Sequence, residues 1–164
     1  MNIITLNQLV NWFADFSSRH YFLNDFGFGE TYDVGTSRSM GLPYLWLSLN
    51  DGSTIGTSNH TVIPTISFNV MVVDKVNIQP NYQDTNGFNS DNAHEILSDT
   101  LSTIYDLVGE INSKWGQYGV VLKSDVSVFP VVDETPDKIY GFMATINLTL
   151  RYVNCIIPAS PITN

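Results

Sequence analysis

The side chains that most often perform catalysis or bind metals are few and far apart in this chain. It has three histidines and one cysteine, at His20, His60, His94 and Cys155. Histidine and cysteine metal sites need clustered ligands, and no HxxxH, HExxH or paired-cysteine spacing is present. A reactive thiol needs an electropositive setting, which the residues around Cys155 do not indicate. The sequence therefore predicts neither a transition-metal site nor a cysteine nucleophile.

The glycine-rich and acidic segments match no catalytic or cofactor motif either. Residues 27–29 form a Gly-Phe-Gly run without the third glycine or the strand-to-helix context of a dinucleotide-binding loop, and no P-loop or GxSxG is present. Asp133, Glu134 and Asp137 lack the spacing of an EF-hand, and a turn containing proline explains them. We therefore predict no catalytic, metal-binding or cofactor-binding residues, and a protein that is not an enzyme.

The charges that do follow a pattern form an acidic stripe along one side of a predicted helix. The stripe consists of Glu95, Asp99, Asp106 and Glu110. Like charges four residues apart cost an isolated helix about 0.2–0.5 kcal/mol per pair. Two interpretations stay open: a solvated face of an acidic protein, or a surface that meets a basic partner or repels an anion. A net charge of −9 with scattered basic residues argues against nucleic-acid binding through a basic footprint.

The helix that carries the stripe is predicted from Ser90 to Trp115. Its apolar residues recur at spacings of three and four, the pattern of a one-sided helix about 39 Å long. Asn92 and Glu95 have the spacing of a capping box. Gly116 is expected to end the helix in a left-handed turn.

A shorter helix is predicted to begin after Thr5 and to end near Arg19, because Thr5 and Gln8 also have capping-box spacing. Residues 21–41 indicate an irregular strand or hairpin followed by a loop. Residues 42–49 are nearly all apolar, which favours a strand that is buried on both faces or one that a neighbouring subunit covers.

Alternating apolar residues predict three further strands, over residues 63–76, 120–128 and 142–152. Residues 50–62 are polar and are expected to form a loop. A second polar loop, over residues 77–89, is expected to lead into the long helix.

The predicted order is therefore α-β-β-β-α-β-β. This order indicates an α+β fold: an antiparallel sheet of about four to five strands with a short N-terminal helix and one long central helix packed on one face. Residues 1–155 are expected to form a single domain, and residues 156–164 an extended C-terminal arm. Ile156, Ile157 and Ile162 in that arm are candidates for contacts between subunits, although a frayed terminus explains them equally well.

The content of charged and apolar residues also indicates where the protein works. Only 14% of the residues are charged, below the usual quarter, which favours a surface that ends inside an assembly. The first residues lack the basic and apolar regions of a signal peptide, and no run approaches eighteen apolar residues, so we expect neither secretion nor a membrane span. We expect a protein that is made in a reducing cytoplasm.

Five segments carry a resemblance to a known class of proteins: TLNQLVNWFADF, LPYLWLSL, SFNVMVVDKV, EILSDTLSTIYDLV and GFMATINLTLRY. In this order they resemble tail-terminator and neck-completion (head–tail connector) proteins of tailed bacteriophages, including the small neck-ring proteins of crAss-like phages. The resemblance covers nearly the whole chain, and it transfers no catalytic residue.

The resemblance implies a structural virion protein that forms a ring of six or twelve copies at the neck or tail. Its partners would be further copies of itself and portal, adaptor or tail-tube proteins, with passive contact to double-stranded DNA in the channel and none to a membrane. Assembly would occur in the host cytoplasm. The acidic stripe would then face the channel, and residues 50–62 and 77–89 would contact neighbours.

Two other functions stay open. A monomeric α+β binding module predicts a sizeable apolar pocket, and an enzyme predicts a cleft with convergent carboxylates.

Overall fold

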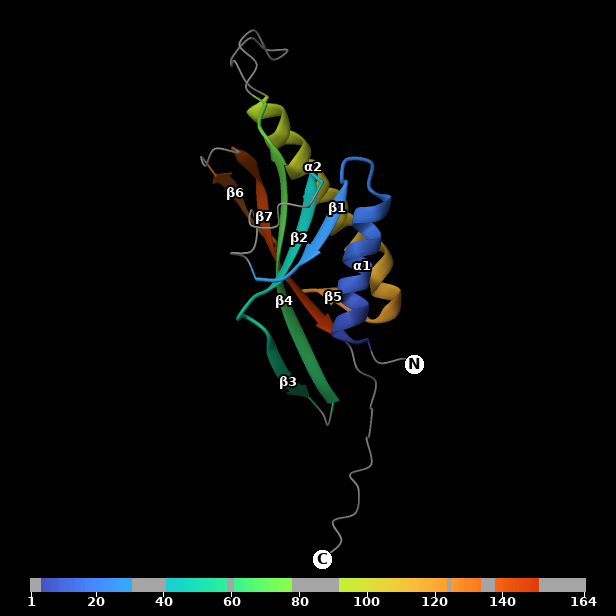
Figure 1. The fold of residues 1–164 in the computed structure, drawn as a ribbon. Coiled ribbons are helices and arrows are strands. Elements are labelled where there is room, and N and C mark those ends of the chain that lie inside the picture. Colours follow the sequence, from blue (N-terminus) through green and yellow to red (C-terminus); the bar gives the residue numbers. More distant parts are fainter. Residues whose placement is uncertain are drawn as a thin grey trace, which may run out of the picture.

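The chain folds into one seven-stranded sheet with two α-helices packed against it (Figure 1). The computed structural model describes residues 4–30, 41–58, 61–77, 92–123, 125–133 and 138–150. The elements follow the order α1 (Leu6–Arg19), β1 (Asp25–Phe28), β2 (Tyr44–Leu49), β3 (Thr54–Ser58), β4 (Thr61–Lys75), α2 (Ala93–Lys114), a 3₁₀ helix η2 (Trp115–Tyr118), β5 (Val120–Leu122), β6 (Ser127–Asp133) and β7 (Ile139–Leu150). The predicted α+β class, with a short first helix and one long helix, is confirmed.

The first helix begins as its capping residues predict. The Thr5 Oγ1 atom accepts a hydrogen bond from the Gln8 N–H at 3.3 Å, and the Thr5 N–H donates to Gln8 Oε1 at 2.8 Å. Both partners of the capping box are therefore in place, and together they satisfy two backbone donors at the open end of the helix.

The long helix differs from the prediction at both ends. Asn92 is its N-cap residue, but its side chain accepts a hydrogen bond from the Asn77 N–H at 2.8 Å instead of capping the helix, so the predicted capping box with Glu95 is wrong. Gly116 does not end the helix in a left-handed turn either. The chain tightens into η2, and Gly119 takes the left-handed conformation at φ 83°.

The sheet has the strand order β1-β2-β4-β7-β5, with β3 paired to β4 and β6 paired to β7. All pairs are antiparallel except β1 with β2, which is parallel, so the prediction of a wholly antiparallel sheet misses one pair. The seven strands exceed the four to five expected, for two reasons. Residues 50–62 contain β3 and were predicted as a loop, and residues 120–128 divide between β5 and β6.

The division between β5 and β6 has a local cause in the register with β7. Leu122 pairs with Leu148, whereas Ser127 pairs with Thr145. Four residues on the β5–β6 side therefore lie opposite two on β7, and this excess bends the chain out of a single ladder.

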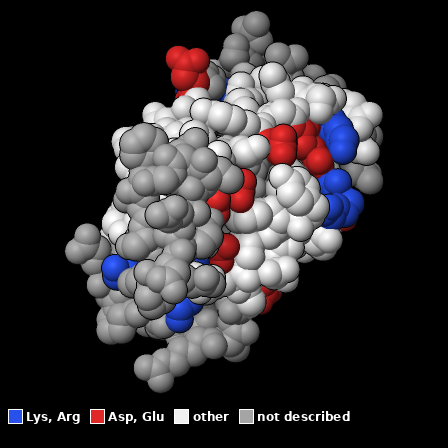
Figure 2. Space-filling model, turned by 90° about the horizontal axis from the view of Figure 1, so that it is seen from above, with Lys and Arg blue, Asp and Glu red and all other residues white. Residues whose placement is uncertain are grey.

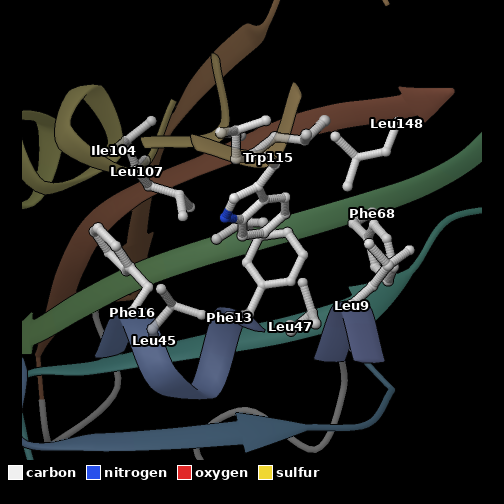
Figure 3. Close-up of a cluster of buried hydrophobic side chains, with 14 of the residues drawn as sticks. Leu9, Phe13, Phe16, Leu45, Leu47, Phe68, Ile104, Leu107, Trp115 and Leu148 are labelled. Carbon is white, nitrogen blue, oxygen red and sulfur yellow. The ribbon is translucent and has the colours of Figure 1, made fainter. Parts of the chain in front are cut away.

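The main core lies between the helices and one face of the sheet (Figure 3). The Phe13 ring from α1 contacts Phe68 on β4 and Trp115 in η2, with centroids 5.4 and 5.0 Å apart. Alternate residues of β4 and β7 face this core, as predicted. Trp12 also packs against Trp115, with ring centroids 5.2 Å apart, and so joins α1 to the end of α2.

The opposite face of the sheet holds a second, smaller apolar cluster. Tyr44 and Trp46 from β2 pack there with Met71 and Val73 from β4. The same strand β2 sends Leu45 and Leu47 into the main core. The prediction that residues 42–49 form a strand buried on both faces is therefore confirmed for β2. Within the described residues, no helix combines the length and apolar character that crossing a membrane requires.

Candidate interaction surface

The predicted acidic stripe lies along α2, but α1 engages its second half. Arg19 Nη2 lies 2.7 Å from Glu110 Oε1, and Lys114 Nζ lies 3.1 Å from Glu110 Oε2. His20 Nε2 lies 3.2 Å from Asp106 Oδ2. The contacts of Arg19 and His20 join the end of α1 to α2, whereas the Lys114 contact lies within α2, and all three partly neutralise the stripe.

Glu110 is the most enclosed acid of the stripe, with 13% of its side chain exposed. Burial by itself raises the pKa of this carboxyl, but the hydrogen bonds from Arg19 and Lys114 outweigh burial and leave the pKa lower than its ordinary value. The Glu110 hydrogen bond is also the largest cause that raises the pKa of Arg19. Glu110 therefore works as an ionised clamp between the two helices and is not a free surface charge.

The His20 imidazole is held between the same helices. Its Nδ1 atom accepts a hydrogen bond from the Phe22 N–H at 3.4 Å, and the ring stacks on Tyr21 at a centroid distance of 4.9 Å. With Nδ1 as acceptor, the proton of a neutral ring lies on Nε2 and points to Asp106. A His–Asp pair of this kind can orient a base, but catalysis of acyl transfer also needs a nucleophile beside the imidazole.

Two shallow cavities flank the Arg19–Glu110 ion pair. One of about 260 Å³ is lined by Phe16, Arg19, His20, Tyr21, Asp106 and Glu110. The other, of about 200 Å³, is lined by Trp12, Asp15, Arg19, Glu110, Lys114, Trp115, Gln117 and Tyr118. Neither lining includes a serine, threonine or cysteine, and each cavity is smaller than the roughly 300–1,000 Å³ of ordinary ligand pockets.

The first half of the stripe remains exposed. Glu95 and Asp99 are both exposed on α2. Asp99 lies near Asp74 at the end of β4: burial is the main cause that raises the pKa of Asp74, and the charge of Asp99 raises it further. Figure 2, which views the molecule from above, shows carboxylates beside basic side chains and others away from them. The second half of the stripe is therefore engaged by Arg19, His20 and Lys114, and the first half is exposed.

The sequence prediction missed a projecting hairpin at the opposite end of the molecule. We call β3 and the first residues of β4, Thr61–Thr65, the β3–β4 arm. Figure 1 shows it extending below the part of the sheet that the helices cover. No Asp, Glu, Lys or Arg occurs from Gly52 to Val73. That gap in charge is the one sequence signal that marked this region.

The arm exposes apolar side chains on the side of the sheet that carries the helices. Val62 and Pro64 alternate in step with the buried Phe68 along β4, so they face the same side. Ile55 on β3 pairs with Pro64 and therefore shares that side. Ile55 is 77% exposed and Val62 is 50% exposed. The apolar face of the sheet thus continues past the described helices with Ile55 and Val62 exposed.

The remaining predicted contact residues lie outside the described part of the chain. These are Ile156, Ile157 and Ile162 of the C-terminal arm, and residues 78–89 of the second loop. Cys155, His60, Glu134 and Asp137 lie outside it as well. Among the described residues, no group of three or more His, Cys, Asp or Glu side chains is placed to hold a metal ion.

Comparison with models of known protein families finds no match for this chain, and comparison with curated proteins finds none either.

Proposed function

We propose that this chain is a structural, non-enzymatic subunit of a tailed bacteriophage, a tail terminator or head–tail connector that forms a ring around the DNA channel. Support comes from the resemblance of the five sequence segments to these proteins, and from a surface suited to contacts between subunits. A ring of six or twelve copies needs a head-to-tail interface between two different surfaces of each subunit. Portal, adaptor or tail-tube proteins would lie above and below the ring.

The observation that carries the proposal is the end of the molecule where exposed apolar side chains gather beside the charge-free β3–β4 arm. At that end α1 begins, β1 and β2 finish and the arm extends (Figure 1). The large apolar residues exposed on these elements are Leu6, Phe28, Leu49, Ile55 and Val62. Copies with a net charge of −9 repel one another, and contact through the exposed apolar side chains of the arm, which carries no charged residue, offsets part of that cost.

The exposed half of the acidic stripe would then face the channel. Glu95 and Asp99 are exposed, so they can repel DNA and let it slide without binding, and Arg19 and His20 engage Glu110 and Asp106 in the second half. This assignment expects Glu95→Gln with Asp99→Asn to impair DNA packaging or ejection by assembled virions. Normal packaging and ejection with this pair of changes would refute the role of the stripe in the channel.

The binding-module alternative would place a ligand in the cavities between α1 and α2. Their small volumes and the ion pair that separates them count against it. It predicts a monomer whose melting temperature rises with a small apolar ligand.

The test is the mass of the purified protein over a concentration series, combined with electron microscopy of the largest species. We expect closed rings of six or twelve. Val62→Ser should raise the concentration for half-assembly by about fivefold, because it removes roughly 1 kcal/mol of apolar burial from each contact. Val132→Ser on β6 is a matched control, since Val132 is 51% exposed and lies away from the arm.

The proposal would be overturned if the protein stayed monomeric at every concentration and was stabilised by a ligand.

A further inference from the structure

The free edges of the sheet differ in how well they are protected against pairing with another strand. An exposed edge presents unpaired N–H and C=O groups, and proteins usually blunt it with a covering element, a proline, a charge or a very short strand. In the described part of the chain, the outer strands are β1, β3, β5 and β6.

The edge of β1 is protected by a covering helix, and the edge of β5 is protected because the strand is very short. Helix α1 packs against β1, and Ser17 Oγ donates a hydrogen bond to the Asp25 carbonyl oxygen at 2.9 Å. Strand β5 has three residues and is followed directly by Lys123. Neither strand offers a continuous row of free donors and acceptors.

The edge of β6 is blunted by proline. The Lys123 N–H donates to the Asn147 carbonyl, so the odd-numbered residues of β7 direct their backbone groups towards β5 and β6. Pro130 pairs with the even-numbered Phe142, so its backbone faces outwards. Because Pro130 has no N–H, it interrupts the donor row of this edge.

The β4 edge of the arm is blunted in the same way. The Ser67 carbonyl accepts a hydrogen bond from the Asn50 N–H, so Ser67 and its odd-numbered neighbours on β4 face the β2 and β3 side. Pro64 has the opposite parity and faces away from β3. Its missing N–H therefore falls on the β7 side, at the point where the β4–β7 ladder ends with the pair Thr65–Thr149.

Strand β3 has none of these protections. Thr54 and Gly56 pair with odd-numbered residues of β4, so they direct their backbone groups inwards. Ile55 and Thr57 alternate with them and direct their N–H and C=O groups outwards. No described strand pairs with this side, and Figure 1 shows β3 as the outermost strand at its end of the molecule. The strand contains no proline and no charged residue.

We propose that β3 pairs in antiparallel fashion with β3 of a second copy of this chain. The partner must offer a bare edge, and β3 is the one edge of the described strands that is not blunted. A two-fold axis at Gly56 would set Ile55 opposite Thr57 of the other copy, and each such pair would exchange two hydrogen bonds. The result would be a continuous four-stranded arm, β4-β3-β3-β4.

Side chains and charge favour the same pairing. Gly56 would meet Gly56 at a non-hydrogen-bonded position, where antiparallel strands approach most closely. Ile55 of each copy would lie diagonally across from the other, within reach of contact, and beside the exposed Val62. No charged side chain lies between Gly52 and Val73, so two acidic chains can meet here without direct repulsion. This contact goes beyond the proposed ring, because it is two-fold and would join two subunits or two rings.

Disulfide cross-linking tests the register. In a full-length Cys155→Ser background, Gly56→Cys places two thiols at the axis, and oxidation should convert most of the protein into a covalent dimer. The added Cβ at residue 56 has room, since its nearest contact is the Ile63 carbonyl oxygen at 3.5 Å. Thr54→Cys is the control: its counterpart lies away from the axis, so it should remain largely monomeric under the same conditions. Equal cross-linking at both positions, or none at Gly56, would overturn the register.

Mass measurements test the pairing without a new thiol. Ile55→Lys should weaken dimerisation by about tenfold or more, because like charges would face each other across the axis. Val132→Lys adds the same charge to the blunted β6 edge and should leave the dimer unchanged. Thr57→Pro removes an outward N–H from each copy and should also weaken the dimer, whereas Thr57→Ala should not.

The outcomes separate this pairing from the ring. Rings that survive Ile55→Lys with no Gly56→Cys cross-link would refute strand pairing and leave the ring proposal standing. Cross-linked dimers that never form larger species would uphold strand pairing and count against the ring.

Discussion

Strand β4 passes through two regions that share a pattern of residues but differ in what surrounds them. In its second half, Phe68, Val70 and Val72 are fully buried, with β2 and β7 on either edge and the helices above. In its first half, Val62 and Pro64 keep the same alternation and pair with β3, and the ladder with β7 begins only at Thr65. Alternation therefore predicts which side a residue faces. Burial depends on whether another element, or another molecule, covers that side.

The largest difference between the two regions should appear in stability. Phe68→Ala should lower the free energy of unfolding by about 3–5 kcal/mol, because it leaves a cavity against Phe13. Ile55→Ala, in the arm, should change it by less than about 0.5 kcal/mol. Urea unfolding of both variants measures the contrast, and equal losses would contradict the division into covered and uncovered regions.

A close backbone contact in the covered region should matter nearly as much. A Cβ atom at Gly141 would overlap the Val72 carbonyl oxygen and lie 2.9 Å from the Val73 Cα atom, both of which are backbone. We expect Gly141→Ala to cost about 3 kcal/mol of stability. Gly109→Ala is the matched control, because a Cβ there meets nothing within 4 Å and alanine favours the helix by about 0.5–1 kcal/mol. If thermal unfolding showed that both substitutions raise the stability, or that both lower it, this account would be refuted.

The clamp between the helices should have a smaller, pH-dependent effect. Glu110→Gln should cost about 1 kcal/mol at neutral pH, since the Arg19 and Lys114 hydrogen bonds lose their charged acceptor. The pKa of Glu110 is lowered in the folded protein, so its contribution is fully present above its ordinary pKa of 4.5 and disappears as the pH falls through the folded value. Unfolding curves of wild type and variant should therefore converge on acidification. A difference that stayed constant down to strongly acidic pH would show that Glu110 acts through packing and not through charge.

The smallest stability effect belongs to the uncovered arm, where assembly should change instead. Val62→Ser should leave the melting temperature within about 2 °C of the wild type, because a half-exposed valine loses little burial in the isolated chain. The same variant should assemble less readily at equal concentration. If Val62→Ser instead unfolded the monomer, Val62 would contribute to the core of the isolated chain. The distinction between a covered and an uncovered half of β4 would then be wrong.

Local signals predicted the parts of the fold that depend on neighbours in sequence. The Thr5–Gln8 capping box and the alternation of β4 and β7 follow from spacing, and the doubly buried β2 follows from its continuous apolar run. Strand β3 was missed because both of its faces are exposed, so no apolar period marks it. The side chain of Asn92 was diverted from its helix by Asn77, which is fifteen residues away in the sequence.

The acidic stripe shows the same limit at the candidate surface. Spacing placed its four carboxylates on one side of α2, as the structure has them. Spacing could not reveal that Arg19, 91 residues from Glu110, and His20, 86 residues from Asp106, would engage two of them. The apolar arm was hidden for a different reason, since its exposure depends on where the helices end in space.

The placement of the tryptophans gives the two sides of the sheet separate optical reporters. Trp12 and Trp115 contact each other under the helices, whereas Trp46 is buried on the other face. A variant with Trp12→Phe and Trp115→Phe would leave fluorescence that responds to the back of the sheet, and Trp46→Phe would leave fluorescence that responds to helix docking. Refolding followed with these two emission signals would show whether the apolar clusters on the two faces of the sheet form in one step or one after the other.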